Sequence, residues 1–179
     1  ETNPNKGPII MTSVEGLHHR AGYGWWDVAR LNNNLQLIER ENVPIVHVDM
    51  DVIVLKDLTP LVELDSDIII SREPQGEKAF PQECSKILGF GVCTGFYIIK
   101  PSASAFMRKI YDMMYNKKYG SLSDQVTIMN YIVNSQYTLE DVNFGTIIHI
   151  DNIKIYVLHK TIIVRDPMKD IGQYDQWFP

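Results

Sequence analysis

Residues 43–55 read VPIVHVDMDVIVL, and this stretch decides the fold class. Apart from Pro44 and the polar positions His47, Asp49 and Asp51, nearly all of its residues are aliphatic, and most are β-branched. A short apolar run of β-branched residues is typical of a strand that is buried on both faces. We therefore predict a buried strand near the start of this stretch, with two carboxylates inside an apolar segment.

The segments around this strand alternate between helix and strand patterns. Apolar residues recur at helical spacing over residues 25–40, where we expect Trp25 and Trp26 to pack in the core or at the helix entry. The alternation implies an α/β sandwich. The other expected helices cover residues 58–64, 102–115 and a segment from Ser121 or Ser123 to residue 133. The other expected strands cover residues 9–14, 67–71, 93–99, 146–150 and 153–164. Residues 72–92 are expected to form a long loop.

The composition limits the function classes. The 179 residues carry 17 basic and 22 acidic side chains, and the net charge of −5 argues against a broad nucleic-acid-binding surface. No apolar run reaches the roughly 18 residues of a membrane span. The two cysteines, Cys84 and Cys93, do not make a disulfide framework. We expect residues 1–179 to form a single domain, or an incomplete part of a larger one.

Asp49 and Asp51 are the residues that point most directly to chemistry. Side chains two positions apart in a strand point the same way, so the two carboxylates converge. Burying both charges unpaired is costly, and a divalent cation that prefers oxygen ligands removes that cost. The pattern predicts an Mg²⁺ or Mn²⁺ site at the carboxyl edge of the strand, where open α/β sheets bind ligands. The alternative is a pair of acids that faces water at a strand end.

The sequence VDMD at residues 48–51 locally resembles the haloacid-dehalogenase-like phosphatases. That resemblance would make Asp49 a nucleophile and Asp51 an acid/base. Two features argue against it: a strand and a helix precede the pair, and Val52-Ile53 stand where that family commonly has Gly followed by Thr or Val. A third alternative is a non-catalytic binding module.

An ordered set of segments resembles the GT-A nucleotide-diphospho-sugar glycosyltransferases over about residues 25–164. The resemblance implies a Rossmann-type, mostly parallel sheet flanked by helices, with less chain before the acidic pair than this family usually has. The His-x-x-Gly motif of some members is absent, because residues 159–162 read HKTI. The segments are a helix that carries Arg30, VHVDMDVIVLKDL at residues 46–58, SDIII at 66–70, CTGFYIIK at 93–100 and SDQ at 123–125.

The same resemblance implies a UDP-linked hexose donor, a carbohydrate or protein hydroxyl acceptor, and Mn²⁺ or Mg²⁺ as cofactor, with retention of anomeric configuration favoured. From the residues alone, Arg30 could equally be a solvated helix residue, and Asp124 an acid that complements a helix dipole. The implied site residues are Asp49, Asp51 and His159 for the metal, Arg30, Asp49, Thr94 and Gly95 for the donor, and Asp124 and Gln125 for catalysis.

Overall fold

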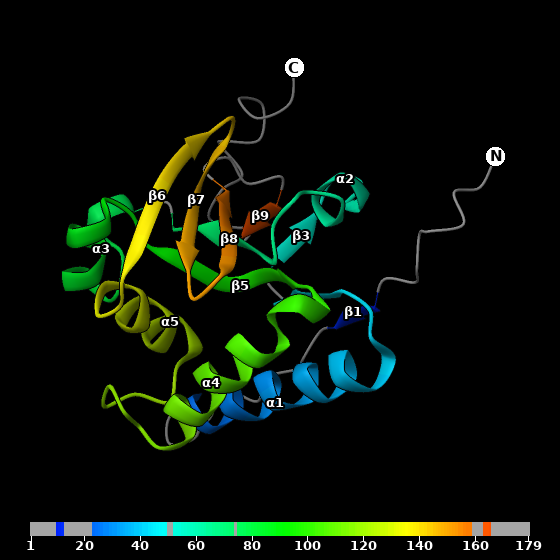
Figure 1. Cartoon of the computed structure of the whole chain (residues 1–179), viewed down its shortest axis with the longest axis horizontal. Coiled ribbons are helices and arrows are strands. Elements are labelled where there is room, and N and C mark those ends of the chain that lie inside the picture. Colours follow the sequence, from blue (N-terminus) through cyan, green and yellow to red (C-terminus); the bar gives the residue numbers. More distant parts are fainter. Residues whose placement is uncertain (1–9, 13–22, 50–51, 74, 159–162, 166–179) are drawn as a thin grey trace.

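The computed structural model describes residues 10–12, 23–49, 52–73, 75–158 and 163–165. These residues form an α/β fold around a seven-stranded sheet with the order β1-β2-β5-β4-β8-β7-β6 (Figure 1). The strands are β1 (Ile10–Thr12), β2 (Ile45–Val48), β4 (Ile68–Arg72), β5 (Val92–Ile99), β6 (Tyr137–Val142), β7 (Gly145–Ile150) and β8 (Ile153–Leu158). The helices are α1 (Tyr23–Glu41), α2 (Thr59–Val62), α3 (Gln82–Leu88), α4 (Ser104–Tyr115) and α5 (Asp124–Val133), with short 3₁₀ turns η1 (Gly76–Lys78) and η2 (Pro101–Ala103).

The sheet is mixed, so the expectation of a mostly parallel sheet is wrong. Only β1 with β2 and β4 with β8 pair in parallel within the described sheet, and the other four pairings are antiparallel. Strand β5 lies between β2 and β4 and runs against both. Strands β7 and β8 form a tight hairpin whose turn residues, Asp151 and Asn152, both have positive φ. Strands buried on both faces are apolar in either direction, so the sequence pattern could not reveal their orientation.

The apolar stretch that begins at residue 43 divides into two strands instead of continuing as one. Strand β2 is fully buried and ends at Val48, whereas β3 (Val52–Val54) pairs with β9 (Ile163–Arg165) in a separate two-stranded sheet. The chain therefore leaves the large sheet at Asp49, next to β5. This departure from the sheet places Asp49 at the carboxyl end of a central strand.

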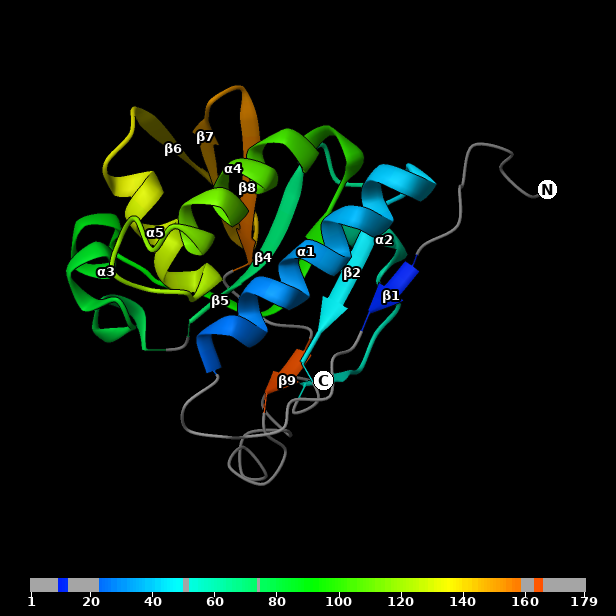
Figure 2. The same ribbon diagram turned by 90° about the horizontal axis from the view of Figure 1, so that it is seen from below.

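Two apolar cores lie on opposite faces of the sheet. Helices α1, α4 and α5 pack on one face (Figure 2), where Leu31, Ile110 and Ile132 have no exposed surface. On the other face, alternate strand residues such as Val46 and Ile69 pack with residues of α2 and β3. This division follows from strand geometry, because successive side chains point to opposite faces.

The segment expected as a long loop contains η1 and helix α3, so that expectation is wrong over residues 76–88. Helix α3 is short and lies among glycines and prolines, which hid its pattern, and it is held by the buried side chains of Cys84, Ser85 and Leu88. Cys84 and Cys93 are both buried. Strand β6 was not predicted, because this edge strand is largely exposed and polar.

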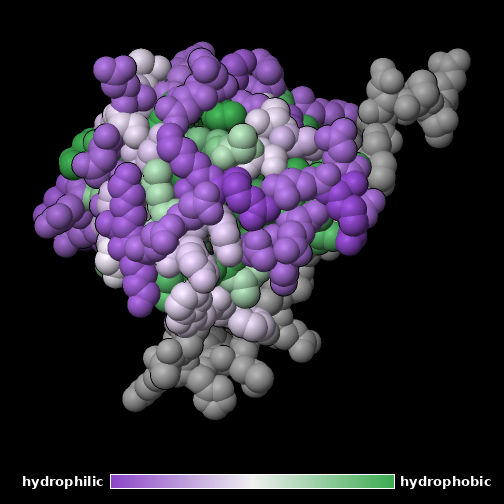
Figure 3. All heavy atoms as spheres, turned by 60° about the horizontal axis from the view of Figure 1, so that its bottom comes forward, coloured by the Kyte–Doolittle hydropathy of each residue, from purple (hydrophilic) through white to green (hydrophobic). Residues whose placement is uncertain are grey.

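Trp25 and Trp26 lie in the first turn of α1 and are 51% and 42% exposed, so they do not pack in the core, which was one of the two expected positions. Trp25 instead contacts the exposed ring of Tyr115 edge-on, with 5.8 Å between the ring centroids. On the face seen in Figure 3, hydrophobic residues form separate patches among hydrophilic ones. None of the helices that the structure describes combines the length and apolar character needed to cross a bilayer.

Candidate active site

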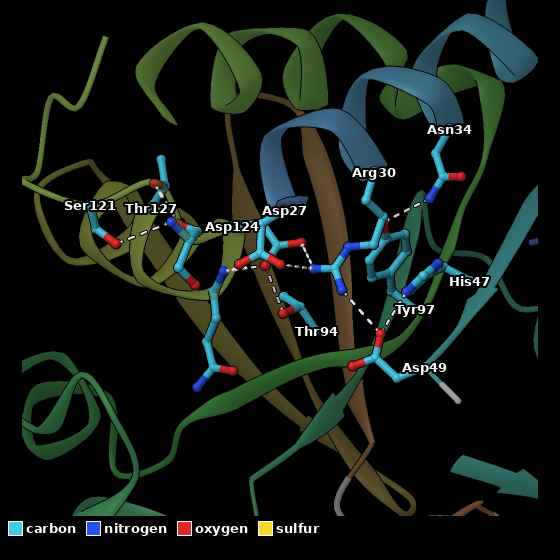
Figure 4. Close-up of polar contacts among 12 residues, drawn as sticks. Asp27, Arg30, Asn34, His47, Asp49, Thr94, Tyr97, Ser121, Asp124 and Thr127 are labelled. Atoms are coloured by element: carbon cyan, nitrogen blue, oxygen red, sulfur yellow. Dashed lines mark hydrogen bonds and ion pairs between the residues drawn. The ribbon is translucent and has the colours of Figure 1, made fainter. Parts of the chain in front are cut away.

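One face of helix α1 supplies the polar groups at the centre of the site. Asp27, Arg30 and Asn34 follow one another at helical spacing and face the sheet (Figure 4). Arg30 is 6% exposed and Asn34 is 1% exposed. A guanidinium group so far from water requires compensating charge.

Three carboxylates supply that charge. Arg30 Nη1 donates to Asp49 Oδ1 at 3.0 Å, and Nη2 pairs with Asp124 and, at 3.3 Å, with Asp27 Oδ1 (Figure 4). Burial alone lowers the pKa of Arg30, but Asp124 above all raises it, so the net shift is upward. Arg30 Nε is buried and has no hydrogen-bond partner in the described part of the chain.

Asp49 is held at the end of β2 from two sides. Its backbone N–H donates to the carbonyl of Gly95 on β5 at 2.8 Å, which extends the ladder between the strands. Its Oδ1 lies 2.9 Å from Nε2 of the fully buried His47. A Cβ at Gly95 would come within 3.0 Å of Asp49 Oδ2. The missing side chain at Gly95 thus leaves space for this carboxylate.

The ring of Tyr97 on β5 packs against the ring of His47 on β2. Tyr97 lies opposite His47 in the pairing of β5 with β2, and the two rings stack with centroids 4.8 Å apart. The Tyr97 hydroxyl accepts a hydrogen bond from Asn34 Nδ2 at 2.9 Å. Burial raises the pKa of this phenol, so Tyr97 remains protonated.

Asp124 lies in the first turn of α5 and is only 1% exposed. Its Oδ1 accepts hydrogen bonds from Thr94 Oγ1 at 2.7 Å and from the backbone N–H of Gln125 at 2.8 Å, while Oδ2 pairs with Arg30. Both oxygens therefore have donors, and the helix N-terminus adds further favourable charge. This arrangement holds Asp124 as a fixed acceptor.

The site holds more negative than positive charge. Asp27, Asp49 and Asp124 surround a single guanidinium, and burial followed by the charge of Asp124 raises the pKa of Asp27 to about 7. A low-dielectric site with this imbalance either holds a proton or attracts a cation.

The structure brings together most of the predicted site residues, namely Arg30, Asp49, Thr94, Gly95, Asp124 and Gln125. The predicted metal ligands Asp51 and His159 lie outside the described residues. Among the described histidines, His149 on β7 pairs with Glu140 on neighbouring β6 at 2.9 Å and lies four strands away from β2. Among the described side chains alone, no three His, Cys, Asp or Glu residues gather as a metal-binding group.

Sequence reasoning missed four members of the site, and three of them leave a signal in the sequence. Asp27 and Asn34 lie three residues before and four residues after Arg30, the spacing that puts side chains on one helix face. His47 lies two residues before Asp49 and so projects to the same side of the strand. Tyr97 lies two residues after Gly95 and gives no comparable signal, because its partner is on another strand.

Comparison with known proteins identifies the family. The family model described as nucleotide-diphospho-sugar transferase matches residues 28–177, which is most of the chain. The chain belongs to this family. The match confirms the resemblance drawn from residues 25–164, and it covers Arg30, Asp49 and Asp124.

Among solved structures, the chain is similar to "crystal structure of a glycosyltransferase involved in the glycosylation of the major capsid of PBCV-1". The two are 15% identical with a TM-score of 0.47, and the match covers 66% of this chain and 59% of the other. The chain thus spans less than two thirds of the length of that protein. No protein of curated function matches it significantly.

Proposed function

We propose that the chain is a metal-dependent glycosyltransferase that moves a hexose from a UDP-linked donor to a hydroxyl group. Family membership supports transfer from a nucleotide diphosphate sugar. The observation that carries the proposal is the position of Asp49, at the carboxyl end of β2 and between Arg30 and the bare backbone of Gly95. Membership of a transferase family also favours this proposal over the alternative that the chain is a phosphatase.

The residues present fit a divalent cation. Asp49 supplies a carboxylate, the ligand type that Mg²⁺ and Mn²⁺ prefer, and the space left by Gly95 lies beside its Oδ2. We assign Asp49 and Asp51 to the metal, with His159 as a third ligand. When bound, the cation would neutralise the charge that develops on the leaving diphosphate. It would also offset the excess of carboxylates around Arg30.

We assign positioning roles to Arg30 and Asp124. Arg30 bridges the two carboxylates and fixes their separation, so that the metal side and the sugar side of the site keep one geometry. Asp124 already accepts hydrogen bonds on both oxygens and is nearly inaccessible. It is therefore better suited to orienting the donor sugar, with the neighbouring Thr94 and Gly95, than to removing a proton. Such a role agrees with retention of anomeric configuration.

The test is release of UDP from a panel of UDP-hexoses, with GDP-sugars for comparison, in the presence of Mn²⁺ or Mg²⁺. We expect Asp51→Asn to abolish release, because Asn keeps the shape but loses the charge that binds a hard cation. Asp65→Asn is the matched control, since Asp65 is 94% exposed and pairs only with Lys154 among the contacts described here. Full activity in excess EDTA would overturn the metal assignment. Phosphatase activity with a phosphoaspartate at Asp49 would overturn the transferase assignment.

A further inference from the structure

The backbone around Phe80 is held firmly between η1 and α3. The Phe80 carbonyl accepts a hydrogen bond from Gln125 Nε2 at 2.6 Å. The preceding Ala79 is 1% exposed, and a Cβ at Gly91 would come within 2.4 Å of the Ala79 Cβ. The backbone of residue 91 therefore packs directly against Ala79, with no room for a side chain between them. After Phe80, the Pro81 carbonyl accepts the N–H of Ser85 at 3.1 Å.

The side chain of Phe80 is nonetheless 68% exposed. Single exposed apolar residues are common on protein surfaces and need no special reason. Phe80 differs from such residues because its backbone is hydrogen-bonded to Gln125, a residue of the candidate site. Gln125, which binds the Phe80 carbonyl through its side chain, also donates its backbone N–H to Asp124. One residue thus links the backbone of Phe80 to the carboxylate that we assign to the donor sugar.

This combination suits the recognition of a sugar. A pyranose presents a face of C–H groups, which packs on the flat face of an aromatic ring, while its hydroxyl groups require polar partners. Because the backbone of Phe80 is already held, binding such a face orders only the two side-chain torsions of the ring, which limits the loss of conformational entropy. A peptide that offers a Ser or Thr hydroxyl presents such a face only where it also carries a proline or an aromatic residue, whereas every pyranose carries one.

We propose that Phe80 is the stacking platform of the acceptor subsite and that the acceptor is a carbohydrate rather than a protein hydroxyl. This inference rests on the proposed glycosyl transfer and narrows it to one class of acceptor. The acceptor ring lies on Phe80, on the side of the site where α5 begins, and its reacting hydroxyl points toward the donor sugar beside Asp124.

The experiment measures saccharide binding by saturation-transfer NMR in the presence of UDP and Mn²⁺. The probes are the methyl glycosides of glucose, galactose and mannose, together with their disaccharides and a Ser/Thr-containing peptide. We expect the wild type to transfer saturation to the ring protons of at least one saccharide. Phe80→Ala should bind that saccharide about tenfold more weakly, and Phe80→Trp should retain it.

Phe144→Ala is the matched control, because Phe144 is 67% exposed at the turn between β6 and β7, at the far edge of the sheet. It should bind the saccharide as the wild type does. If Phe80→Ala fails to fold, as judged by its melting curve, the comparison of Phe80→Trp with the non-aromatic Phe80→Leu replaces it. A saccharide signal that is unchanged in the Ala or Leu variant overturns the proposal.

Two further outcomes also overturn it: no saccharide signal in the wild type, or binding of the peptide alone. UDP affinity of the wild type is measured separately by calorimetry. Failure to bind UDP contradicts the proposed function itself, whereas UDP binding with a Phe80-independent saccharide contradicts only the acceptor subsite.

Discussion

Asp27 couples the stability of the fold to pH, and replacing it by Asn tests the charge balance of the site directly. The carboxyl group lies 3.3 Å from the Arg30 guanidinium and faces the charges of Asp124 and Asp49. Burial, and then the charge of Asp124, raises its pKa from 3.8 to about 7. The folded protein therefore holds a proton on Asp27 over a pH range in which the unfolded chain has lost it.

The sign of the effect follows from this difference. Between about pH 4 and pH 7 the folded state binds more protons at Asp27 than the unfolded state, so the free energy of unfolding falls as the pH rises. The full difference between the two pKa values corresponds to roughly 4 kcal/mol at 1.36 kcal/mol per pH unit. Because the side chain is 26% exposed, we expect solvent screening to reduce this to about 2 kcal/mol.

Asn has the shape of a protonated Asp and cannot ionise, so Asp27→Asn should be close to the wild type in stability near pH 4 and exceed it by about 2 kcal/mol at pH 8. The measurement is urea denaturation at pH 4, 5, 6, 7 and 8 in EDTA, which removes any bound cation. Asp112→Asn, on the exposed surface of α4, controls for the loss of a negative charge and should follow the wild-type profile. A variant that is less stable than wild type at pH 8, or a difference that does not change with pH, would refute the reasoning.

Three other substitutions test contacts of the fold and the site. Asp124→Asn removes the principal counter-charge of buried Arg30 and should lower the free energy of unfolding by about 3 kcal/mol in urea denaturation; a loss below about 1 kcal/mol would contradict a buried ion pair. Gly95→Ala places a Cβ 3.0 Å from Asp49 Oδ2 and should weaken UDP binding with Mn²⁺ about tenfold or more, measured by calorimetry, while the melting temperature changes little; unchanged affinity would show that the carboxylate can move without cost. Gly145→Ala would bring a Cβ within 2.7 Å of a backbone carbonyl on β8, so we expect a loss of roughly 3 kcal/mol or more, and a melting temperature equal to that of wild type would be inconsistent with the observed packing.

Local patterns of the sequence predicted much of the fold. The buried strand that precedes Asp49, and the helix that carries Leu31 and Leu35, follow from β-branching and from helical spacing, which act over a few residues. The direction of a strand depends on partners far along the chain. Local patterns therefore could not predict that β5 lies between β2 and β4 and runs antiparallel to both. The exposure of Trp25 and Trp26 could not be predicted either, because it depends on which other segments of the chain cover the start of the helix in the folded protein.

The sequence predicted which residues belong to the candidate site, but it did not predict which of them pair with one another. Arg30, Asp49 and Asp124 were singled out one at a time, as a basic helix residue, a strand-end acid and a helix-start acid. Their pairing depends on the distances between α1, β2 and α5, which no local pattern contains. For the same reason, no local pattern indicated that Asp124 is one of the least accessible acids of the described chain.

The pairing of Arg30 with Asp124 has a consequence for the order in which the protein folds. The two residues are separated by 94 positions, so a ribosome releases Arg30 long before its principal counter-charge exists. Dehydrating the guanidinium before then would leave it with only Asp27 and Asp49 as partners and without its principal counter-charge, which disfavours close docking of α1 on a nascent sheet. Closing so long a loop is itself slow. We therefore expect α1 to remain hydrated during synthesis and to dock in a late, cooperative step, once α5 has emerged.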